Sequence, residues 1–203
     1  MKDDNFTLKR KQPIRIKHKM GFHAELSNQF SSSNQELTKE EKAETLEILV
    51  ESYKALSADT KNLISNLANA SSLLWFCYKG MNINVNWTGF YILDSADDKK
   101  LVLAPFQGKV ACQEIFFGKG VCGTAASSSE TQLVPNVHEY ANHIACDGET
   151  KSEIVVPIKH NGKVVGVIDL DCLDFSGFDE IDKLYLEQLA EAIASSCDWE
   201  KYI

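Results

Sequence analysis

The chain has 203 residues, of which 44% are hydrophobic and 25% are charged, and its formal net charge is −8. This composition is that of one ordinary folded domain, and it excludes collagen-like and disordered proteins. No stretch reaches the roughly 20 apolar residues that a membrane span needs, and residues 1–20 lack the apolar segment of a secretory signal. The six cysteines are therefore expected to stay reduced, in the cytoplasm or the nucleus. They are too few for a disulfide scaffold, so any cysteine with a function is expected to act in catalysis, redox chemistry or metal binding rather than as a structural cross-link.

Charge is unevenly distributed along the chain. Residues 1–20 carry seven Lys or Arg against two Asp, or +5, which leaves 14 Lys or Arg against 27 Asp or Glu, or −13, for residues 21–203. Because an acidic body repels phosphate backbones, no nucleic acid partner is expected for the folded part. We predict that residues 1–37 form a basic, disordered extension and that residues 38–203 form the domain. The extension is either merely solvated or a contact for RNA, a membrane or a sorting receptor.

Two helices are predicted before any strand. Thr38 and Glu41 form a capping box, which indicates a helix start, ahead of apolar residues at helical spacing. These apolar residues are Leu46, Leu49, Val50, Tyr53 and Leu56. A second helix is predicted to begin near Asp59 and to end at Gly80. Its apolar face consists of Leu63, Leu67, Ala70 and Leu74.

The pattern then changes to that of strands. From Val85 onwards, apolar and aromatic residues recur with period two, and residues 94–98 supply a turn before a returning strand at 101–106. Residues 108–123 and 127–150 have no regular pattern and are predicted to be irregular or loop-like. An antiparallel pair followed by long irregular segments is therefore expected.

The last part of the chain is regular again. Two strands, at 154–159 and 163–171, are predicted to form a hairpin around Asn161-Gly162. A closing amphipathic helix follows the polar cluster at residues 176–182. Its apolar face is expected to consist of Ile181, Leu184, Leu189, Ile193 and Cys197. Helices at both ends around consecutive strands indicate an α+β fold, a single domain with a central antiparallel sheet.

Three cysteines, Cys112, Cys122 and Cys146, lie in the irregular part of the chain, where loops commonly line a cleft. Their spacing resembles no zinc-binding knuckle, even with His143 as a further ligand, so no bound metal is expected. Thiol redox chemistry fits better. One thiol can attack an oxidised substrate, and a second can then displace water from the resulting sulfenic acid.

The other three cysteines are interpreted differently. Cys77 and Cys197 fall among apolar residues of predicted helices, where a free cysteine is usually a small core residue. Cys172 follows the last strand, and its role stays open.

Acidic residues gather at the end of the last predicted strand. Asp169 and Asp171 are two positions apart, so they lie on one face of that strand. A two-residue hairpin loop would turn Glu153 away from them, whereas a three-residue loop with Gly162 in a left-handed conformation would pair Glu153 with Asp169. We favour the second register, which predicts three carboxyl groups close together. Such a group can protonate a leaving oxygen near neutral pH if burial raises its pKa; otherwise the strand end simply emerges into water.

Two weaker signals precede these acids. Trp87 and Tyr91, four positions apart on a strand, share a face and form either a pocket wall or ordinary core. Residues 118–123 match a dinucleotide-binding glycine pattern, but two helices precede them and a loop follows, so no NAD site is predicted. A short helix opening at Gly123 would offer free N–H groups to a small carboxylate, if the segment is not simply a tight turn.

Four segments of the chain resemble one known family. They are FQGKVAC (106–112), FGKGVCGTA (117–125), HIACDGETKSEIVVP (143–157) and GVIDLD (166–171). Over roughly residues 38–199 the chain is similar to the free methionine-(R)-sulfoxide reductases, which have a GAF-domain fold. The basic extension has no counterpart in this family.

The resemblance implies thiol-dependent reduction of free L-methionine (R)-S-oxide to methionine, a protection against oxidative damage, through a sulfenic acid and an intramolecular disulfide. The resemblance also implies a role for each of three thiols: Cys146 is the nucleophile, Cys112 the main resolving thiol and Cys122 a further redox thiol. It also places Glu153, Asp169 and Asp171 at the sulfoxide and ammonium of the substrate, and Trp87 and Tyr91 beside its side chain. No bound cofactor is implied, and thioredoxin, supplied with electrons by NADPH, would restore the dithiol. A homodimer is also expected, because the terminal helices of such domains often pair.

Two other classes of protein compete with this interpretation. A GAF-type small-molecule sensor would keep the pocket and the helices but would not need three cysteines in the irregular segments, and a zinc-stabilised interaction protein would contain bound metal. The three cysteines favour the reductase. We further expect clustered carboxylates to oppose thiolate formation in the empty site, and the ammonium of a free amino acid to relieve this opposition.

Overall fold

The computed structural model describes residues 37–141 and 147–203. Residues 1–36, where most of the basic extension is predicted, and residues 142–146, which include His143 and Cys146, lie outside the described residues. The helices are α2 (Lys39–Ser57), α3 (Leu63–Gly80), α4 (Gly120–Ser128) and α5 (Glu180–Ser196), with short 3-10 helices η1 (Val137–Glu139) and η2 (Trp199–Lys201). The strands are β1 (Val85–Asp94), β2 (Asp97–Gly108), β3 (Glu114–Phe116), β4 (Gln132–Val134), β5 (Ser152–His160) and β6 (Lys163–Cys172). None of the helices in this part of the chain is long and apolar enough to cross a membrane.

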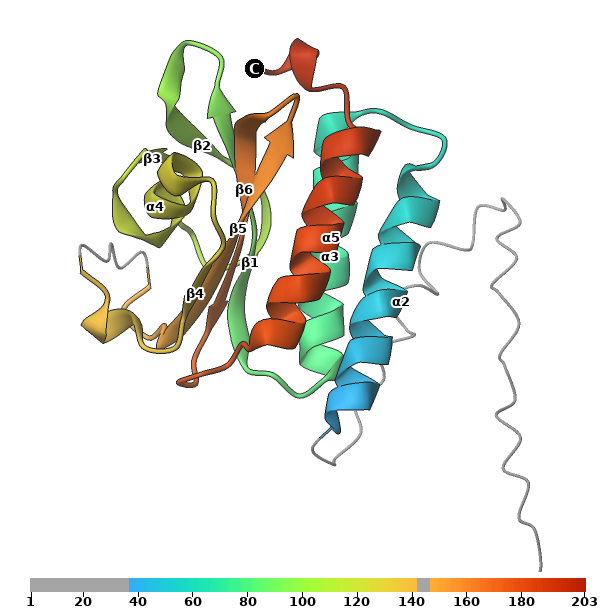
Figure 1. Ribbon diagram of the computed structural model, residues 1–203, viewed down its shortest axis with the longest axis vertical. Helices are drawn as coiled ribbons and strands as arrows, with labels where there is room; N and C mark the ends of the chain where they lie inside the picture. The colour runs from blue at the N-terminus through green and yellow to red at the C-terminus, as the bar shows by residue number, and fades with distance from the viewer. Residues whose placement is uncertain (1–36, 142–146) are drawn as a thin grey trace, which may run out of the picture.

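The strands form one antiparallel sheet in the order β3-β2-β1-β6-β5-β4. Helices α3 and α5 lie on one face of the sheet, and α2 packs against both of them from outside (Figure 1). Helix α4 lies on the opposite side of the sheet (Figure 1). The predicted α+β fold, with a central antiparallel sheet and helices from both ends of the chain, is confirmed.

Each face of the sheet has its own hydrophobic core, because successive side chains of a strand point to opposite faces. The larger core, which includes Ile168 and Leu170 of β6, lies beneath α3 and α5. The smaller core lies beneath α4 and includes Trp87 and Tyr91 of β1. Asp169, between the two inward residues of β6, therefore points to the α4 face. The apolar pattern of the strands thus assigns the candidate functional groups to one side of the sheet.

The helix boundaries follow the caps. Thr38 caps α2 and forms the predicted capping box with Glu41. Helix α3 begins at Leu63 rather than near Asp59, because the side chain of Asn62 accepts a hydrogen bond from the backbone N–H of Ser65 and so caps the helix there. Its predicted end at Gly80 is confirmed.

The segments predicted to be irregular contain regular structure. Strand β3 and helix α4 fall within or overlap residues 108–123, and strand β4 and helix η1 fall within residues 127–150. Helix α4 begins at Gly120, three residues before the predicted start at Gly123. These elements are short, so they carry too few residues for a periodic pattern to be recognisable.

Helix α5 differs from its prediction at two positions, because Cys197 follows the last helical residue, Ser196, as the C-cap, and Leu184 does not lie on the buried face. Leu184 is 53% exposed, and Leu186 is fully buried. Leu189 and Ile193 are buried as predicted.

The turn between β5 and β6 differs from the favoured prediction. His160 pairs with Lys163, so the loop has two residues, and both of them, Asn161 at φ 50° and Gly162 at φ 77°, have positive φ. This is the backbone of a type I′ hairpin turn, for which Asn-Gly is the preferred sequence. The predicted three-residue loop is therefore wrong.

A β-bulge restores the alignment of the acids that the shorter turn would have lost. Ile158 pairs with Gly166 while Lys159 pairs with Val164, so β6 contains one extra residue at this point. Beyond the bulge Glu153 pairs with Asp171 instead of Asp169. Glu153 still lies on the same face as both acids, as predicted, but for a different reason.

A buried ion pair ties the outer helix to the rest of the molecule. The ammonium of Lys42 on α2 contacts the carboxylate of Asp182 on α5, which is fully buried. The hydroxyl of Tyr78 on α3 donates to the same carboxylate at 3.0 Å. Three helices thus meet at one charged group.

Removing the cation of this pair is expected to destabilise the fold. Lys42→Ala should lower the free energy of unfolding by about 2–4 kcal/mol, because it leaves Asp182 buried without its counter-ion. The matched control is Lys54→Ala on the same helix, whose ion pair with Glu51 is exposed and should contribute about 0.5 kcal/mol or less. Chemical denaturation of both variants checks the difference, and equal losses would contradict it.

Candidate functional site

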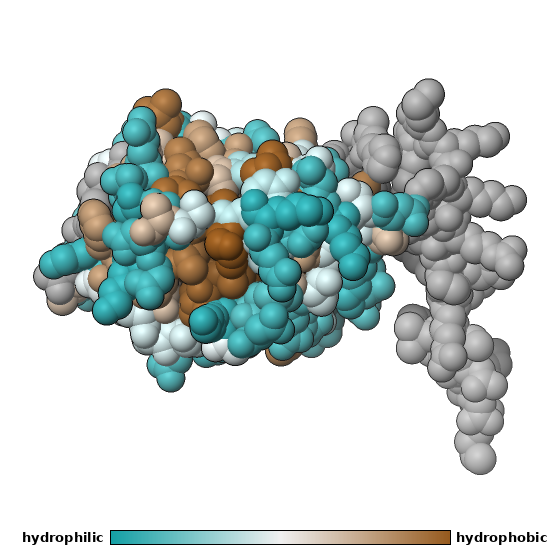
Figure 2. All heavy atoms as spheres, turned by 90° about the horizontal axis from the view of Figure 1, so that it is seen from above, coloured by the Kyte–Doolittle hydropathy of each residue, from teal (hydrophilic) through white to brown (hydrophobic). Residues whose placement is uncertain are grey.

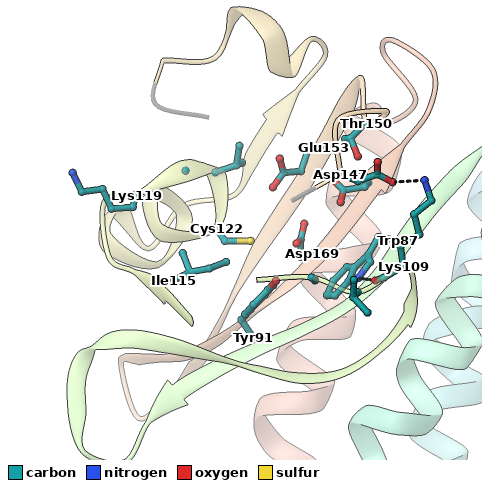
Figure 3. A pocket seen from close by; sticks show the side chains of 15 residues that line it. Trp87, Tyr91, Lys109, Ile115, Lys119, Cys122, Asp147, Thr150, Glu153 and Asp169 are labelled. Carbon is teal, nitrogen blue, oxygen red and sulfur yellow. Dashed lines mark hydrogen bonds and ion pairs between the residues drawn. The ribbon is translucent and has the colours of Figure 1, made fainter. Parts of the chain in front are cut away.

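A pocket opens on the α4 face of the sheet, where β1, β5 and β6 meet the N-terminal turn of α4 (Figure 3). It encloses about 40 Å³. Its lining includes Trp87, Tyr91, Lys109, Cys122, Asp147, Thr150, Glu153, Asp169 and Asp171. The structure thus brings six of the residues singled out in the sequence into one pocket. They are the three acids Glu153, Asp169 and Asp171, the aromatic pair Trp87 and Tyr91, and the thiol of Cys122.

The three acids converge from two neighbouring strands. Asp169 pairs with Val155 of β5 on one side and with Gly89 of β1 on the other, and Asp171 pairs with Glu153. The exposed fractions of Glu153 and Asp169 are only 6% and 7%. One oxygen of Asp169, Oδ1, is buried without a hydrogen-bond partner. The alternative of a strand end emerging into water is therefore excluded for Glu153 and Asp169, while Asp171, nearer the strand end, is half-buried.

Burial and mutual repulsion change the acidity of this cluster. Burial raises the pKa of Asp169 to about 7. Burial raises the pKa of Glu153 well above its usual range, and the charges of Asp169 and Asp171 add to the effect. The pKa of Asp171 is likewise raised by burial and by Asp169. The cluster therefore holds protons near neutral pH, as a general acid must.

Cys122 belongs to this cluster rather than to a loop. It lies in the first turn of α4 and is 4% exposed. Its Sγ and the nearest carboxylate oxygens of Glu153 and Asp169 all lie within 4.8 Å of one another, and the thiol points towards the acids (Figure 3). Burial, with the charges of the two acids, raises the pKa of this thiol well above its usual range. The predicted loop position is wrong, and a thiol held in a helix among acids is a weak nucleophile.

The other cysteines lie in different parts of the molecule. Cys112 lies between β2 and β3, packs partly buried against the smaller core and is disulfide-bonded. The expectation that all six cysteines stay reduced is therefore wrong for Cys112. Cys146 lies outside the described residues. Cys77 and Cys197 are buried free thiols in the larger core, as predicted, and Cys172, left open above, is buried there too.

The aromatic pair forms one wall of the pocket. The rings of Trp87 and Tyr91 stack with centroids 5.8 Å apart, and Phe106 stacks on Trp87 at 5.2 Å. Gly89 lies between the pair, and a Cβ there would lie 2.4 Å from the Cβ of Phe106 and 2.7 Å from the Trp87 ring. The indole N–H of Trp87 donates to the backbone oxygen of Lys109 at 3.2 Å, which fixes the ring beside the loop after β2.

A polar network at the rim was not foreseen from the sequence. The amide of Asn86 on β1 donates to Asp147 at 3.2 Å and to Thr150 at 2.9 Å. The ammonium of Lys109 pairs with Asp147 at 3.2 Å and with Glu149. The segment before Cys112 is thus joined to the segment that follows residues 142–146. No local signal marks these residues, because Asn86 and Asp147 lie 61 positions apart.

Comparison with known proteins identifies the class. Residues 72–196 match the model of the GAF domain, and the antiparallel sheet with α3 and α5 on one face and the pocket on the other agrees with it. The chain is a GAF-domain protein.

Closer relatives identify the family within this class. The chain is 56% identical over 179 residues to the free methionine-R-sulfoxide reductase of Saccharomyces cerevisiae, covering 87% of this chain and 96% of that protein. It is 40% identical to the Escherichia coli protein of the same name, over 74% of this chain and 88% of the relative. The solved structure of free methionine-R-sulfoxide reductase from Neisseria meningitidis, in complex with its substrate, has a TM-score of 0.73 at 35% identity, covering 84% of this chain and 95% of that one. The chain belongs to the free methionine-R-sulfoxide reductase family, and it is an oxidoreductase.

Proposed function

We propose that this chain reduces free methionine (R)-sulfoxide to methionine, with its own cysteines as the electron donors. The observation that carries the proposal is the cluster formed by buried Glu153 and Asp169 with half-buried Asp171, which faces an aromatic wall in one pocket. A sulfoxide has a polar oxygen that must be protonated and an apolar thioether that must be packed. The acids suit the first requirement, and Trp87 and Tyr91 suit the second.

The first step uses Cys146 as the nucleophile. Its thiolate attacks the sulfoxide sulfur, and an acid of the cluster gives its proton to the sulfoxide oxygen. The attack joins the two sulfur atoms. This S–S bond and the S–O bond of the substrate then break as the protonated oxygen passes to the cysteine sulfur, so methionine leaves and Cys146 becomes a sulfenic acid. Asp169 suits this acid role, because its pKa of about 7 keeps a proton available at neutral pH.

The second step returns the sulfur to a recyclable state. The thiol of Cys112 attacks the sulfenic sulfur, a disulfide forms, and the oxygen leaves as water. The disulfide-bonded state of Cys112, while Cys77, Cys122, Cys172 and Cys197 are free, supports this assignment. Cys122, buried among acids, enters the exchange only after the site rearranges. An external dithiol, which we propose to be thioredoxin supplied by NADPH, then reduces the disulfide.

The charge of the pocket favours a free amino acid over a residue in a peptide. A substrate ammonium neutralises part of the acid cluster, and so stabilises a thiolate nearby. A blocked amino group lacks this charge and leaves the acids buried without a cation. The same acids therefore select the free amino acid as substrate and, once paired with its ammonium, allow the nucleophile to become a thiolate.

We also propose a homodimer located in the cytoplasm. Exposed apolar side chains on two of the helices, Ile48 on α2 and Ile64 and Phe76 on α3, support a contact between subunits. Seen from above, most of the visible surface is made of hydrophilic residues, and hydrophobic residues reach it in a band through the middle (Figure 2).

Turnover of three substrates tests the proposed reaction. Free methionine (R)-sulfoxide is expected to be reduced, and N-acetyl methionine (R)-sulfoxide at least about 100-fold more slowly, since the pocket's buried acids are left without a cation by a blocked substrate. The S epimer, which carries the same ammonium, is also expected to be reduced more slowly, and this expectation comes from the family resemblance alone. The measurement is thioredoxin-coupled NADPH oxidation, repeated with dithiothreitol to separate the reductant from the chemistry. Equal rates with the N-acetyl compound would contradict selection by the ammonium, and no turnover of any substrate would favour a sensor.

A further inference from the structure

The acid cluster and the buried thiol together resemble a ligand set. Cys122 Sγ and one carboxylate oxygen each of Glu153 and Asp169 lie within 4.8 Å of one another, and all three residues are buried. Tetrahedral zinc ligands, with bonds of about 2.0–2.3 Å, stand about 3.5 Å apart. If the distances between these three atoms shortened by about 1 Å, all three could therefore bind one ion.

An unsatisfied oxygen points to the same ligand. Asp169 Oδ1 is buried without a hydrogen-bond partner, which is costly for a carboxyl group unless something binds to it. Two lysines line the pocket, but neither supplies the missing charge. Lys109 is paired with Asp147 and Glu149, and Lys119 points away from the acids (Figure 3). The described part of the pocket thus has an excess of acceptors over cations.

We infer that Cys122, Glu153 and Asp169 form a binding site for a divalent zinc-like cation, which occupies the pocket when substrate is absent. On binding, the Cys122 thiol releases its proton to solvent and becomes a thiolate ligand. The mixed sulfur and oxygen set suits Zn²⁺ or Cd²⁺, whereas Mg²⁺ and Ca²⁺ prefer oxygen alone. The cavity of about 40 Å³ has room for the ion and one or two waters, which leaves the open position that non-structural zinc sites keep.

The site overlaps the groups that the proposed reaction uses. An ion bound to Asp169 and Glu153 removes the proton donor and occupies the place of the substrate ammonium. Zinc is therefore expected to compete with free methionine sulfoxide, and this second statement rests on the proposed function. The ion is an inhibitor in this scheme and not a resident cofactor.

Cadmium binding to the oxidised protein tests the site without any substrate. In the oxidised state Cys112 is engaged in a disulfide, so it does not compete for the metal. One equivalent of Cd²⁺ is expected to produce the ultraviolet thiolate-to-cadmium charge-transfer band, and excess Zn²⁺ should displace it. Cys122→Ser should abolish the band. Cys172→Ser, which changes another buried free thiol, should keep it.

A second variant guards against misfolding of the first. Glu153→Gln retains Cys122 but loses a carboxylate ligand, so Cd²⁺ affinity should fall at least about tenfold, as it does even when outer-shell groups are lost. A band that survives in Cys122→Ser, or unchanged affinity in Glu153→Gln, would overturn the site. No band in the wild-type protein would overturn it as well. Because no substrate is present, these outcomes are independent of the turnover assay.

Discussion

Cys146→Ser is expected to abolish the release of methionine from free methionine (R)-sulfoxide, by on the order of 10⁵-fold, because no other thiol replaces the lost nucleophile. Cys122 is unsuited to the task. It is buried, and the neighbouring acids hold its pKa well above the usual range. Cys112→Ser should behave differently. It should release one equivalent of methionine and then stop, with a sulfenic acid left on Cys146.

Single-turnover measurements separate these two variants. Methionine is quantified after mixing reduced enzyme with excess substrate in the absence of any reductant, and the sulfenic acid is trapped with dimedone and located by mass spectrometry. The matched control is Cys197→Ser, which alters a core thiol near Tyr53 and Asn66 and should leave one equivalent released and normal turnover with thioredoxin. Stoichiometric release by Cys146→Ser would refute the assignment of the nucleophile.

Features that depend on neighbouring residues were predictable. Thr38 and Glu41 are three positions apart, and the helix they begin is the one predicted. Asp169 and Asp171 share a strand face because they are two positions apart, and the strand pairs leave them together in the pocket. Both statements need only the geometry of one element.

Features that depend on packing between elements were not predictable. The position of Glu153 was expected from a three-residue turn, but it results from a two-residue turn and a bulge at Ile158–Lys159. No local pattern marks that bulge. Helix α4 has nine residues, and its buried side chains are small, so the irregular appearance of residues 108–123 concealed the element that carries Cys122. The rim contact between Asn86 and Asp147 is a product of tertiary structure alone.

Asp169→Asn is expected to lower kcat by about 10²–10⁴-fold, the contribution of a positioned general acid. In the wild-type enzyme, activity should fall as pH rises through about 7, because the acid with its pKa near 7 loses the proton that the sulfoxide oxygen needs. The variant should lack this descending limb. The measurement is kcat against pH for wild type, Asp169→Asn and Glu153→Gln. Loss of the limb in Glu153→Gln alone would transfer the acid role to Glu153.

The same substitution should stabilise the fold at high pH, which distinguishes loss of catalysis from damage to the structure. The pKa of Asp169 is raised from 3.8 to about 7 in the folded protein, so the folded state binds the extra proton and the stability from this group is lost as pH rises from about 4 to about 7. Asparagine carries no charge, so Asp169→Asn should raise the free energy of unfolding by on the order of 2–4 kcal/mol at pH 8 and by little at pH 4.

Asp94→Asn is the control, because ion pairing with Lys100 lowers the pKa of Asp94. That change should bring no gain at pH 8. Thermal unfolding at the two pH values decides the matter, and a destabilised Asp169→Asn at pH 8 would show that the buried acid is structural and that its removal explains any lost activity.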